Sequence, residues 1–244
     1  VTRALAPLDD DAERMGNNLV DFLKNEVKHG RLPENLLPLQ SGVGNVANAV
    51  INGLVHSDFK NLSVYTEVIQ DGMFDLIDES KIDMISGTSL SPSPDGLKRF
   101  YANIEKYSKK IILRPQEISN NGEVHSRIGV VAMNTALEMD IYGHVNSTHV
   151  TGTKLMNGIG GSGDFARNGA LSCFFCHSVA KGGAISAVVP MCSHVDHTEH
   201  DTHVFISEQG VADVRGLSPK ERAKVIINNV AHPTFRDQLM DYFE

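Results

Sequence analysis

Three short segments of this chain contain residues whose types could perform acyl-transfer chemistry. Glu67 follows the apolar run Leu62–Thr66, and a carboxylate can attack a thioester to form a mixed anhydride. Asn120 lies in a polar turn, where its side-chain amide could donate to a developing oxyanion. The glycine-rich loop 158–164 would bring bare backbone N–H groups close to a ligand. These segments therefore suggest a nucleophile with its oxyanion donors.

Each segment also has a simpler interpretation. Glu67 could be a solvated carboxylate at the end of a strand. Asn120 and Asn121 could be plain turn residues, because asparagine tolerates left-handed backbone and hydrogen-bonds locally. The glycines of 158–164 could form a flexible surface turn, and a lone glycine pattern is weak support for a site. The residues alone leave both interpretations open.

The cysteines and histidines raise the question of a metal. The segment Cys173–His177 has the spacing of a haem-attachment motif, and His194, His197, His200 and His203 recur every three residues. However, aromatic residues flank the cysteines, which is typical of small buried thiols, and no second Cys-x-x-Cys completes a zinc site. The acidic residues Asp196, Glu199 and Asp201 could instead hold the histidines by hydrogen bonds. We predict no metal, while a metal-binding module stays an alternative.

Composition narrows the class of protein. The chain has 244 residues, 41% of them hydrophobic, which suits one soluble α/β domain. No apolar stretch approaches the ~20 residues of a membrane span. The net charge of -8 argues against a nucleic-acid partner. Three cysteines favour a reducing compartment, so we expect the cytoplasm in a bacterium, or the mitochondrion or a related organelle in a eukaryote.

The expected elements alternate along the chain. A helix begins at Asp9 and is stopped by Gly30, and the apolar run Leu36–Leu39 suggests a strand. The glycine turn 41–45 and a helix at Val46–Ile51 complete a unit that presents N–H groups to an anion. Further strands are expected at Leu62–Glu67, Asp83–Ser86, Lys109–Leu113, Gly129–Ala132, Ala184–Val189 and His203–Ser207, and further helices at Met73–Asp78, Leu97–Tyr107, Pro219–Asn228 and Thr234–Phe243.

This alternation predicts an α/β fold with an open, mainly parallel sheet flanked by helices. In such a sheet, ligands bind at the carboxyl ends of the strands. Glu67 is expected at one of these ends, so the predicted fold favours a functional role for this residue.

Several longer stretches, taken together, resemble the acetyl-CoA hydrolase/transferase family of class I CoA-transferases, and within it the succinyl-CoA:acetate CoA-transferases. The matching stretches are 40–49, 65–72, 113–120, 140–148, 157–168, 194–201 and 213–217. The likeness covers almost the whole chain. It implies a CoA-transferase-like fold in which residues 1–244 form the C-terminal domain, with the N-terminal domain absent.

The resemblance also implies roles for particular residues. Glu67 matches the nucleophile, which becomes an acyl-glutamyl anhydride and then a glutamyl-CoA thioester. The Val43 N–H and the Asn120 side chain match groups that stabilise oxyanions, and Gly161 matches the glycine whose N–H faces the thioester oxygen. The residues implied to bind CoA are Gly42, Val43, Gly44, Asn45, Val46, Leu137, Gly161 and Lys181.

The implied function is transfer of CoA between an acyl-CoA and a small carboxylate, with succinyl-CoA and acetate as the expected pair. CoA would then be a substrate, no cofactor would be tightly bound, and the protein would be a homodimer. An acetyl-CoA hydrolase that uses the same glutamate is the main alternative. A non-catalytic CoA-binding fragment is another, and a sugar-phosphate isomerase on the same general fold is a third, because a fold alone implies no function.

Overall fold

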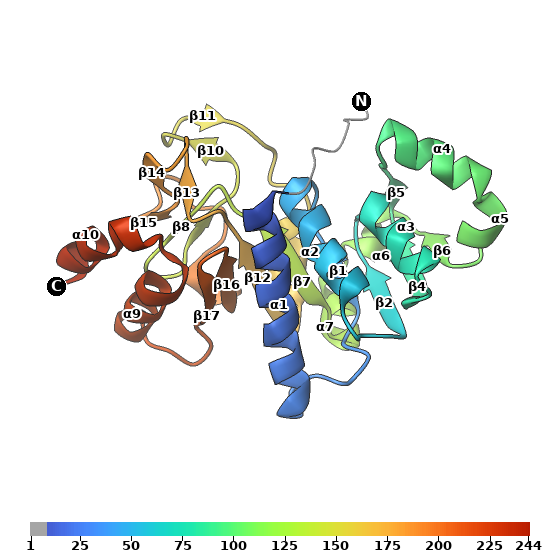
Figure 1. The fold of residues 1–244 in the computed structure, drawn as a ribbon, viewed down its shortest axis with the longest axis horizontal. Coiled ribbons are helices and arrows are strands. Elements are labelled where there is room, and N and C mark those ends of the chain that lie inside the picture. The colour runs from blue at the N-terminus through green and yellow to red at the C-terminus, as the bar shows by residue number, and fades with distance from the viewer. Residues whose placement is uncertain (1–8) are drawn as a thin grey trace.

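The protein is built around an eight-stranded sheet that divides its helices into two layers (Figure 1). The computed structural model describes residues 9–244. The strand order is β17-β16-β12-β7-β1-β2-β4-β6. The strands are β1 Leu39–Ser41, β2 Leu62–Tyr65, β4 Ile82–Gly87, β6 Ile111–Leu113, β7 Val131–Thr135, β12 Leu171–Phe175, β16 Val204–Ser207 and β17 Gly210–Asp213. All neighbours pair in parallel except β16 and β17, which confirms the predicted mainly parallel sheet.

Helices cover both faces of this sheet. One layer contains α1 Asp10–Lys28, α2 Asn45–His56 and α3 Asp71–Asp78, with α4 Pro94–Ala102 and α5 Ile104–Tyr107 beside α3. The other helices are α7 Gly122–Ile128, α8 Ser162–Asn168 and α9 Pro219–Val230, while the short α6 Gln116–Ser119 precedes α7. The last helix, α10 Pro233–Phe243, packs against α9.

Side-chain alternation along the central strand explains the two layers. In β12, Cys173 and Phe175 join a buried cluster that includes Leu19 of α1. Phe174 points the opposite way and joins a second cluster that includes Ile226 of α9. Because successive strand residues face opposite sides, one buried strand supports helices on both faces.

The helix ends follow from local sequence. Asp9 caps α1 by accepting a hydrogen bond from the Ala12 N–H at 2.7 Å. The helix ends at Lys28, and Gly30 has a positive φ of 69°, as expected for a glycine stop. At the other end of the chain, Ser218 is the N-cap of α9 and forms a capping box with Glu221.

Short strands shape the loops that follow the main strands. They are β3 Val68–Ile69, β5 Ser89–Leu90, β8 Glu138–Asp140, β9 Val145–Asn146, β10 His149–Val150, β11 Lys154–Leu155, β13 Val179–Ala180, β14 Ile185–Ser186 and β15 Val188–Val189. For example, β3 follows β2 directly and pairs with β5, so the chain just after Glu67 is held by its own small ladder.

The sequence predictions differ from the structure most clearly at three elements. The expected strand Ala184–Val189 is two short strands, β14 and β15, outside the main sheet. The expected helix Leu97–Tyr107 is broken at Asn103, whose side-chain amide donates to the Arg99 carbonyl and ends α4. The first strand begins at Leu39 and not at Leu36, because Leu36 has a left-handed φ of 57°.

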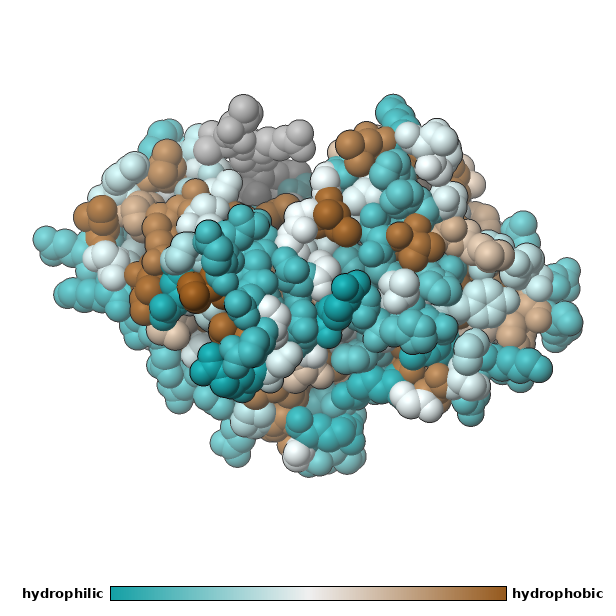
Figure 2. Space-filling model, turned by 180° about the vertical axis from the view of Figure 1, so that it is seen from behind, coloured by the Kyte–Doolittle hydropathy of each residue, from teal (hydrophilic) through white to brown (hydrophobic). Residues whose placement is uncertain are grey.

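The molecular surface is mostly polar. The face shown in Figure 2 is largely hydrophilic, with apolar residues in separate patches. Among the helices of residues 9–244, none is both long and apolar enough to cross a membrane.

Candidate active site

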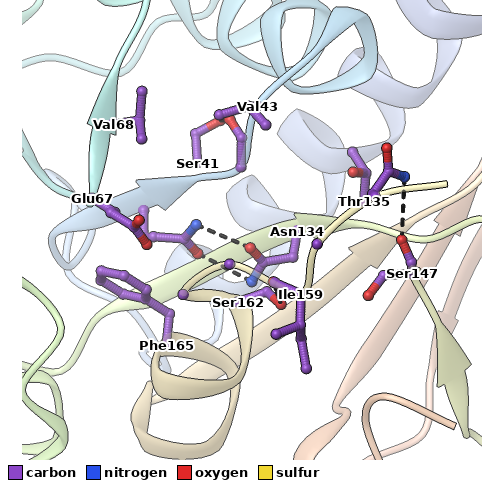
Figure 3. Close-up of a pocket in the computed structure, with 16 residues that line it drawn as sticks. Ser41, Val43, Glu67, Val68, Asn134, Thr135, Ser147, Ile159, Ser162 and Phe165 are labelled. Carbon is purple, nitrogen blue, oxygen red and sulfur yellow. Dashed lines mark hydrogen bonds between the residues drawn. The ribbon is translucent and has the colours of Figure 1, made fainter. Parts of the chain in front are cut away.

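A cavity of about 430 Å³ opens at the carboxyl ends of β1, β2 and β7 (Figure 3). Its lining consists of residues 40–43, Glu67, Val68, Asn134, Thr135, Ser147, residues 157–162 and Phe165. This is the edge of a parallel sheet at which ligands are expected. The predicted glutamate, the first glycine turn and the second glycine loop therefore line the same cavity.

The backbone of Glu67 is fixed on both sides. Its carbonyl accepts hydrogen bonds from the N–H groups of Thr88 and Ser89, at 2.8 and 3.2 Å. The preceding residue, Thr66, donates its hydroxyl to the Ser41 carbonyl at 3.1 Å, which joins the ends of β2 and β1. These contacts fix the backbone from which the Glu67 side chain enters the cavity.

Asn120 and Gly161 meet the Glu67 side chain. The Asn120 Nδ2 group donates to Glu67 Oε2 at 3.0 Å and lies 3.3 Å from Asp164 Oδ2. Gly161 is the N-cap of α8, and any Cβ there would overlap both the Glu67 carboxylate and the Asn120 amide. Only glycine fits at this position, so the backbone of residue 161 can approach the Glu67 carboxylate closely.

Two aromatic residues, Tyr65 and His125, fix the turn that carries Asn120. The Tyr65 hydroxyl donates to the Ile118 carbonyl at 2.7 Å. His125 Nε2 lies 2.7 Å from the Ser119 carbonyl, and the His125 ring stacks on Phe165 with centroids 4.0 Å apart. These contacts link α6, α7 and α8, and they fix the position of the Asn120 amide.

The first glycine turn links β1 to α2 as predicted. Gly42 and Val43 line the cavity, and the Val43 side chain is 58% exposed. Gly44 is the N-cap of α2 with a positive φ of 106°, and Asn45 and Val46 form the first turn of the helix. Gly44 has no side chain to cap this helix, and its own N–H donates to Gln70 Oε1 at 3.4 Å. The N–H groups of the first turn are suited to an anionic group.

Five predicted CoA-binding residues lie outside the cavity lining. Gly44, Asn45 and Val46 continue the first glycine turn, whereas Leu137 and Lys181 lie elsewhere in the chain. Leu137 follows β7, where its N–H donates to the Asn146 carbonyl at 2.9 Å. Lys181 is exposed in the turn between β13 and β14, with a left-handed φ of 49°. Their roles in CoA binding remain predictions.

The cysteines and histidines have structural partners. Burial raises the pKa of Cys173 to about 12 and also raises the pKa of Cys176, which keeps both thiols protonated. His194 pairs with Asp196 at 3.3 Å, and the Ser172 N–H donates to His203 Nδ1. His197 lies 3.1 Å from the Ser162 hydroxyl beside Gly161, and burial lowers the pKa of His197. Within residues 9–244, no three such side chains are grouped as metal ligands.

Sequence reasoning missed a pair of buried amides in the cavity, Gln40 and Asn134. They come from adjacent strands and hydrogen-bond to each other (Figure 3). A signal was present, because each residue is a polar side chain near the end of an apolar strand. Asp164, which shares the Asn120 amide with Glu67, was also missed.

Comparison with known proteins identifies the family of this chain. Residues 96–243 match the model of the acetyl-CoA hydrolase/transferase C-terminal domain. The chain is 61% identical, over 243 residues, to a succinyl-CoA:acetate CoA-transferase from Clostridium kluyveri, covering 100% of this chain and 45% of that protein. It is 51% identical to an acetyl-CoA hydrolase from Candida albicans, covering 98% of this chain and 46% of that protein.

A solved structure shows the same fold. The crystal structure of 4-hydroxybutyrate CoA-transferase from Porphyromonas gingivalis aligns with a TM-score of 0.76 at 24% identity, covering 99% of this chain and 57% of that one. The fold is thus that of a CoA-transferase domain. This chain belongs to the acetyl-CoA hydrolase/transferase family. It spans less than half the length of each of the two relatives named above.

Proposed function

We propose that this chain carries the nucleophile of a CoA-transferase, and that Glu67 is that nucleophile. The observation that supports the proposal most strongly is the contact among three elements in one cavity. The Glu67 carboxylate accepts a hydrogen bond from Asn120 and lies against Gly161, where no side chain fits. A half-buried carboxylate with an amide donor and a bare glycine backbone beside it suits nucleophilic acyl transfer.

The reaction would proceed by two covalent intermediates. A Glu67 oxygen attacks the thioester carbonyl, the C–S bond breaks, and CoA thiolate leaves an acyl-glutamyl anhydride. The thiolate then attacks the glutamyl carbonyl of the anhydride, which releases the free carboxylate and leaves a glutamyl-CoA thioester. An acceptor carboxylate reverses these steps and leaves as the new acyl-CoA. Charge develops on the carbonyl oxygen at each attack, where the Gly161 N–H, the Val43 N–H and the Asn120 amide would stabilise it.

The first turn of α2 would bind part of CoA. Gly44 lies at the N-terminus of this 12-residue helix, close to the cavity residues Gly42 and Val43. Backbone N–H groups at a helix N-terminus favour an anion, and the net charge of -8 gives the chain little other attraction for phosphate groups. We assign Lys181 and Leu137 to more distant parts of CoA on the family resemblance alone.

Hydrolysis is the second candidate, and a relative supports it. The similar protein from Candida albicans bears the name acetyl-CoA hydrolase. Water attacking the anhydride or the glutamyl-CoA thioester would convert the same site into a hydrolase. The two activities share Glu67 and differ in the acceptor, so exclusion of water from the closed site would decide between them.

A single assay separates these activities. Acyl-CoA is supplied with and without an acceptor carboxylate, and free thiol and new acyl-CoA are both measured. A transferase forms new acyl-CoA only when the carboxylate is present and releases little free thiol, whereas a hydrolase releases thiol in either case. The Glu67→Gln variant is expected to abolish both products, and a variant that retains wild-type rates would contradict the proposal.

The assay should use the polypeptide as its gene encodes it. This chain covers 45–46% of the relatives named above, and the family resemblance predicts an additional N-terminal domain and a homodimer. A non-catalytic CoA-binding chain would bind acyl-CoA but would show neither activity.

A further inference from the structure

A buried histidine that the proposed chemistry does not use contacts the loop that carries Gly161. His197 is 1% exposed, and its Nε2 atom lies 3.1 Å from the Ser162 hydroxyl oxygen. Ser162 directly follows Gly161 and lines the same cavity as Glu67 (Figure 3). Because a buried polar side chain is costly without a hydrogen-bond partner, the contact with Ser162 helps to keep His197 buried at this position.

The hydrogen bonds around Ser162 fix the direction of this contact. A serine hydroxyl has a single proton, and the Ser162 hydroxyl donates it to the Ile159 carbonyl at 2.9 Å. The Ser162 oxygen is therefore the acceptor toward His197, so the proton between them belongs to His197 Nε2. Burial lowers the pKa of His197, which favours the neutral ring, and in that ring Nδ1 carries no proton.

Together these two hydrogen bonds hold the glycine loop. Ile159 and Ser162 flank Gly160 and Gly161, so the bond from the Ser162 hydroxyl to the Ile159 carbonyl closes the chain around both glycines. Gly160 has a positive φ of 56°, and a Cβ there would have nothing within 4 Å. Because packing around Gly160 is open, the position of the loop depends on its hydrogen bonds.

His197 is a fixed point for this loop. Its backbone N–H donates to the Val145 carbonyl at 3.1 Å, and its carbonyl accepts from the Val145 N–H at 2.9 Å. Its ring lies against Phe174 of the central strand β12, with centroids 4.9 Å apart. The histidine therefore joins the mobile-backbone glycines of the cavity to the sheet and to the loop that contains Val145.

We propose that His197 is a positioning residue, which acts through Ser162 to hold the Gly161 N–H where the oxyanion develops. This inference rests on the proposed function, because it concerns the oxyanion donor assigned there to Gly161. A displaced donor weakens binding of the transition state more than binding of the substrate. Loss of either hydrogen bond should therefore lower kcat and leave KM for acyl-CoA nearly unchanged.

The test measures CoA transfer from acetyl-CoA by the polypeptide as encoded and by variants of both residues. His197→Leu loses one hydrogen bond and should lower kcat by about 5-fold, and Ser162→Ala loses two and should lower it by about 10- to 30-fold. The double variant should lose no more than Ser162→Ala, because His197 acts through Ser162. His197→Gln should keep kcat within about 3-fold of wild type, since its amide nitrogen can replace Nε2 as the donor.

The matched control is His203→Leu, which removes a histidine of the same segment. His203 Nδ1 accepts from the Ser172 N–H, and His203 does not line the cavity. This variant should keep the wild-type kcat even if it unfolds more easily. Nuclear magnetic resonance of the ¹⁵N-labelled histidines gives a check without any variant, and it should find the proton of His197 on Nε2.

Three outcomes would overturn the inference while the wild type remains active. They are a wild-type kcat in Ser162→Ala, which decides the question even if the His197 variants fail to fold, additive losses in the double variant, and a His197 proton on Nδ1 with Nε2 bare. An inactive wild type would instead refute the proposed function, and the inference with it.

Discussion

Asn120 and Asn121 are adjacent in sequence, yet their side chains have different partners. The Asn120 amide donates to Glu67, whereas Asn121 Oδ1 accepts from the N–H groups of Glu123 and Val124 and caps α7. Asn120→Ala should therefore lower kcat by about 10²–10³, the usual effect of removing one oxyanion donor. Asn121→Ala should cost about 1 kcal/mol of stability and leave kcat near wild type. Steady-state kinetics and urea unfolding of both variants check this, and equal kcat values for the two variants would contradict the assignment.

Gly161 and Gly158 provide a second matched pair of neighbours. A Cβ at Gly161 would overlap the Glu67 carboxylate and the Asn120 amide, whereas a Cβ at Gly158 has nothing within 4 Å. Gly161→Ala should reduce kcat/KM by about 10²-fold or more, because small displacements of reacting groups are costly. Gly158→Ala should have little effect on kcat/KM. Wild-type activity of Gly161→Ala would remove this residue from the proposed site.

Some residues that meet in the cavity could be predicted from the sequence, and others could not. Glu67 was predictable because a carboxylate at a strand end before a glycine is a local pattern, and the glycine loop carrying Gly161 is local too. Asn120 could not be separated from an ordinary turn residue until the fold placed it 3.0 Å from Glu67. The Gln40–Asn134 pair spans 94 positions of sequence, and no local pattern reveals a contact of that range.

The same distinction holds for helices and strands. The first helix was predicted because its apolar residues repeat with helical spacing between clear start and stop signals. The central strand β12 was not predicted, since Leu171–Phe175 is buried on both faces and therefore lacks the alternation of a half-buried strand. In addition, Cys173 of this strand was interpreted as part of a possible metal-binding motif and not as a buried strand residue.

A buried ion pair fastens α1 to the sheet. Glu26 of α1 is 1% exposed and pairs with Arg31 at 2.6 Å and Arg215 at 3.0 Å. Glu26→Ala should lower the free energy of unfolding by about 2–3 kcal/mol at pH 7. This is less than the loss expected for a fully buried ion pair, because both arginines are partly exposed. Urea unfolding measures this, with Lys24→Ala as a control because the Lys24–Asp58 pair is exposed.

The pH dependence gives an independent check on this pair. The hydrogen bond from Arg31 holds the pKa of Glu26 below its ordinary value of 4.5, although burial opposes this shift. A carboxyl group with a lowered pKa in the folded state contributes stability above pH 4.5 and loses it as the pH falls through the folded pKa. Stability should therefore decline below pH 4.5 more steeply in the wild type than in Glu26→Gln. Identical pH profiles would contradict a stabilising role for the Glu26 charge.

The contact between α1 and α2 depends on two glycines. A Cβ at Gly16 would lie 2.9 Å from the Ala49 carbonyl oxygen, and a Cβ at Gly53 would lie 3.0 Å from the Gly16 backbone. Gly16→Ala should destabilise the fold by about 1–3 kcal/mol through overpacking, despite the better helix propensity of alanine. The control is Gly163→Ala in α8, where the nearest atom is 3.9 Å away. A rise in thermal stability for Gly16→Ala would show that the two helices can separate without cost.

At the scale of the whole molecule, the sheet brings distant segments to one edge. The ends of β1, β2 and β7 and the loop before α8 converge on a single cavity. Exposed apolar residues occur in the loop that lines this cavity and just before it, including Ile159, Leu155 and Met156. Because the chain spans less than half the length of its relatives, its activity is best measured in the polypeptide as encoded.

The most direct test of the account is mass spectrometry of that polypeptide after incubation with acyl-CoA. We predict a mass gain of one CoA, mapped by proteolysis to the peptide that contains Glu67 and absent from Glu67→Ala. Such an adduct would establish the glutamyl-CoA thioester on which the proposed transfer and hydrolysis both depend. A wild-type protein that turns over acyl-CoA without any adduct on this peptide, or an adduct that persists in Glu67→Ala, would contradict the central role of Glu67.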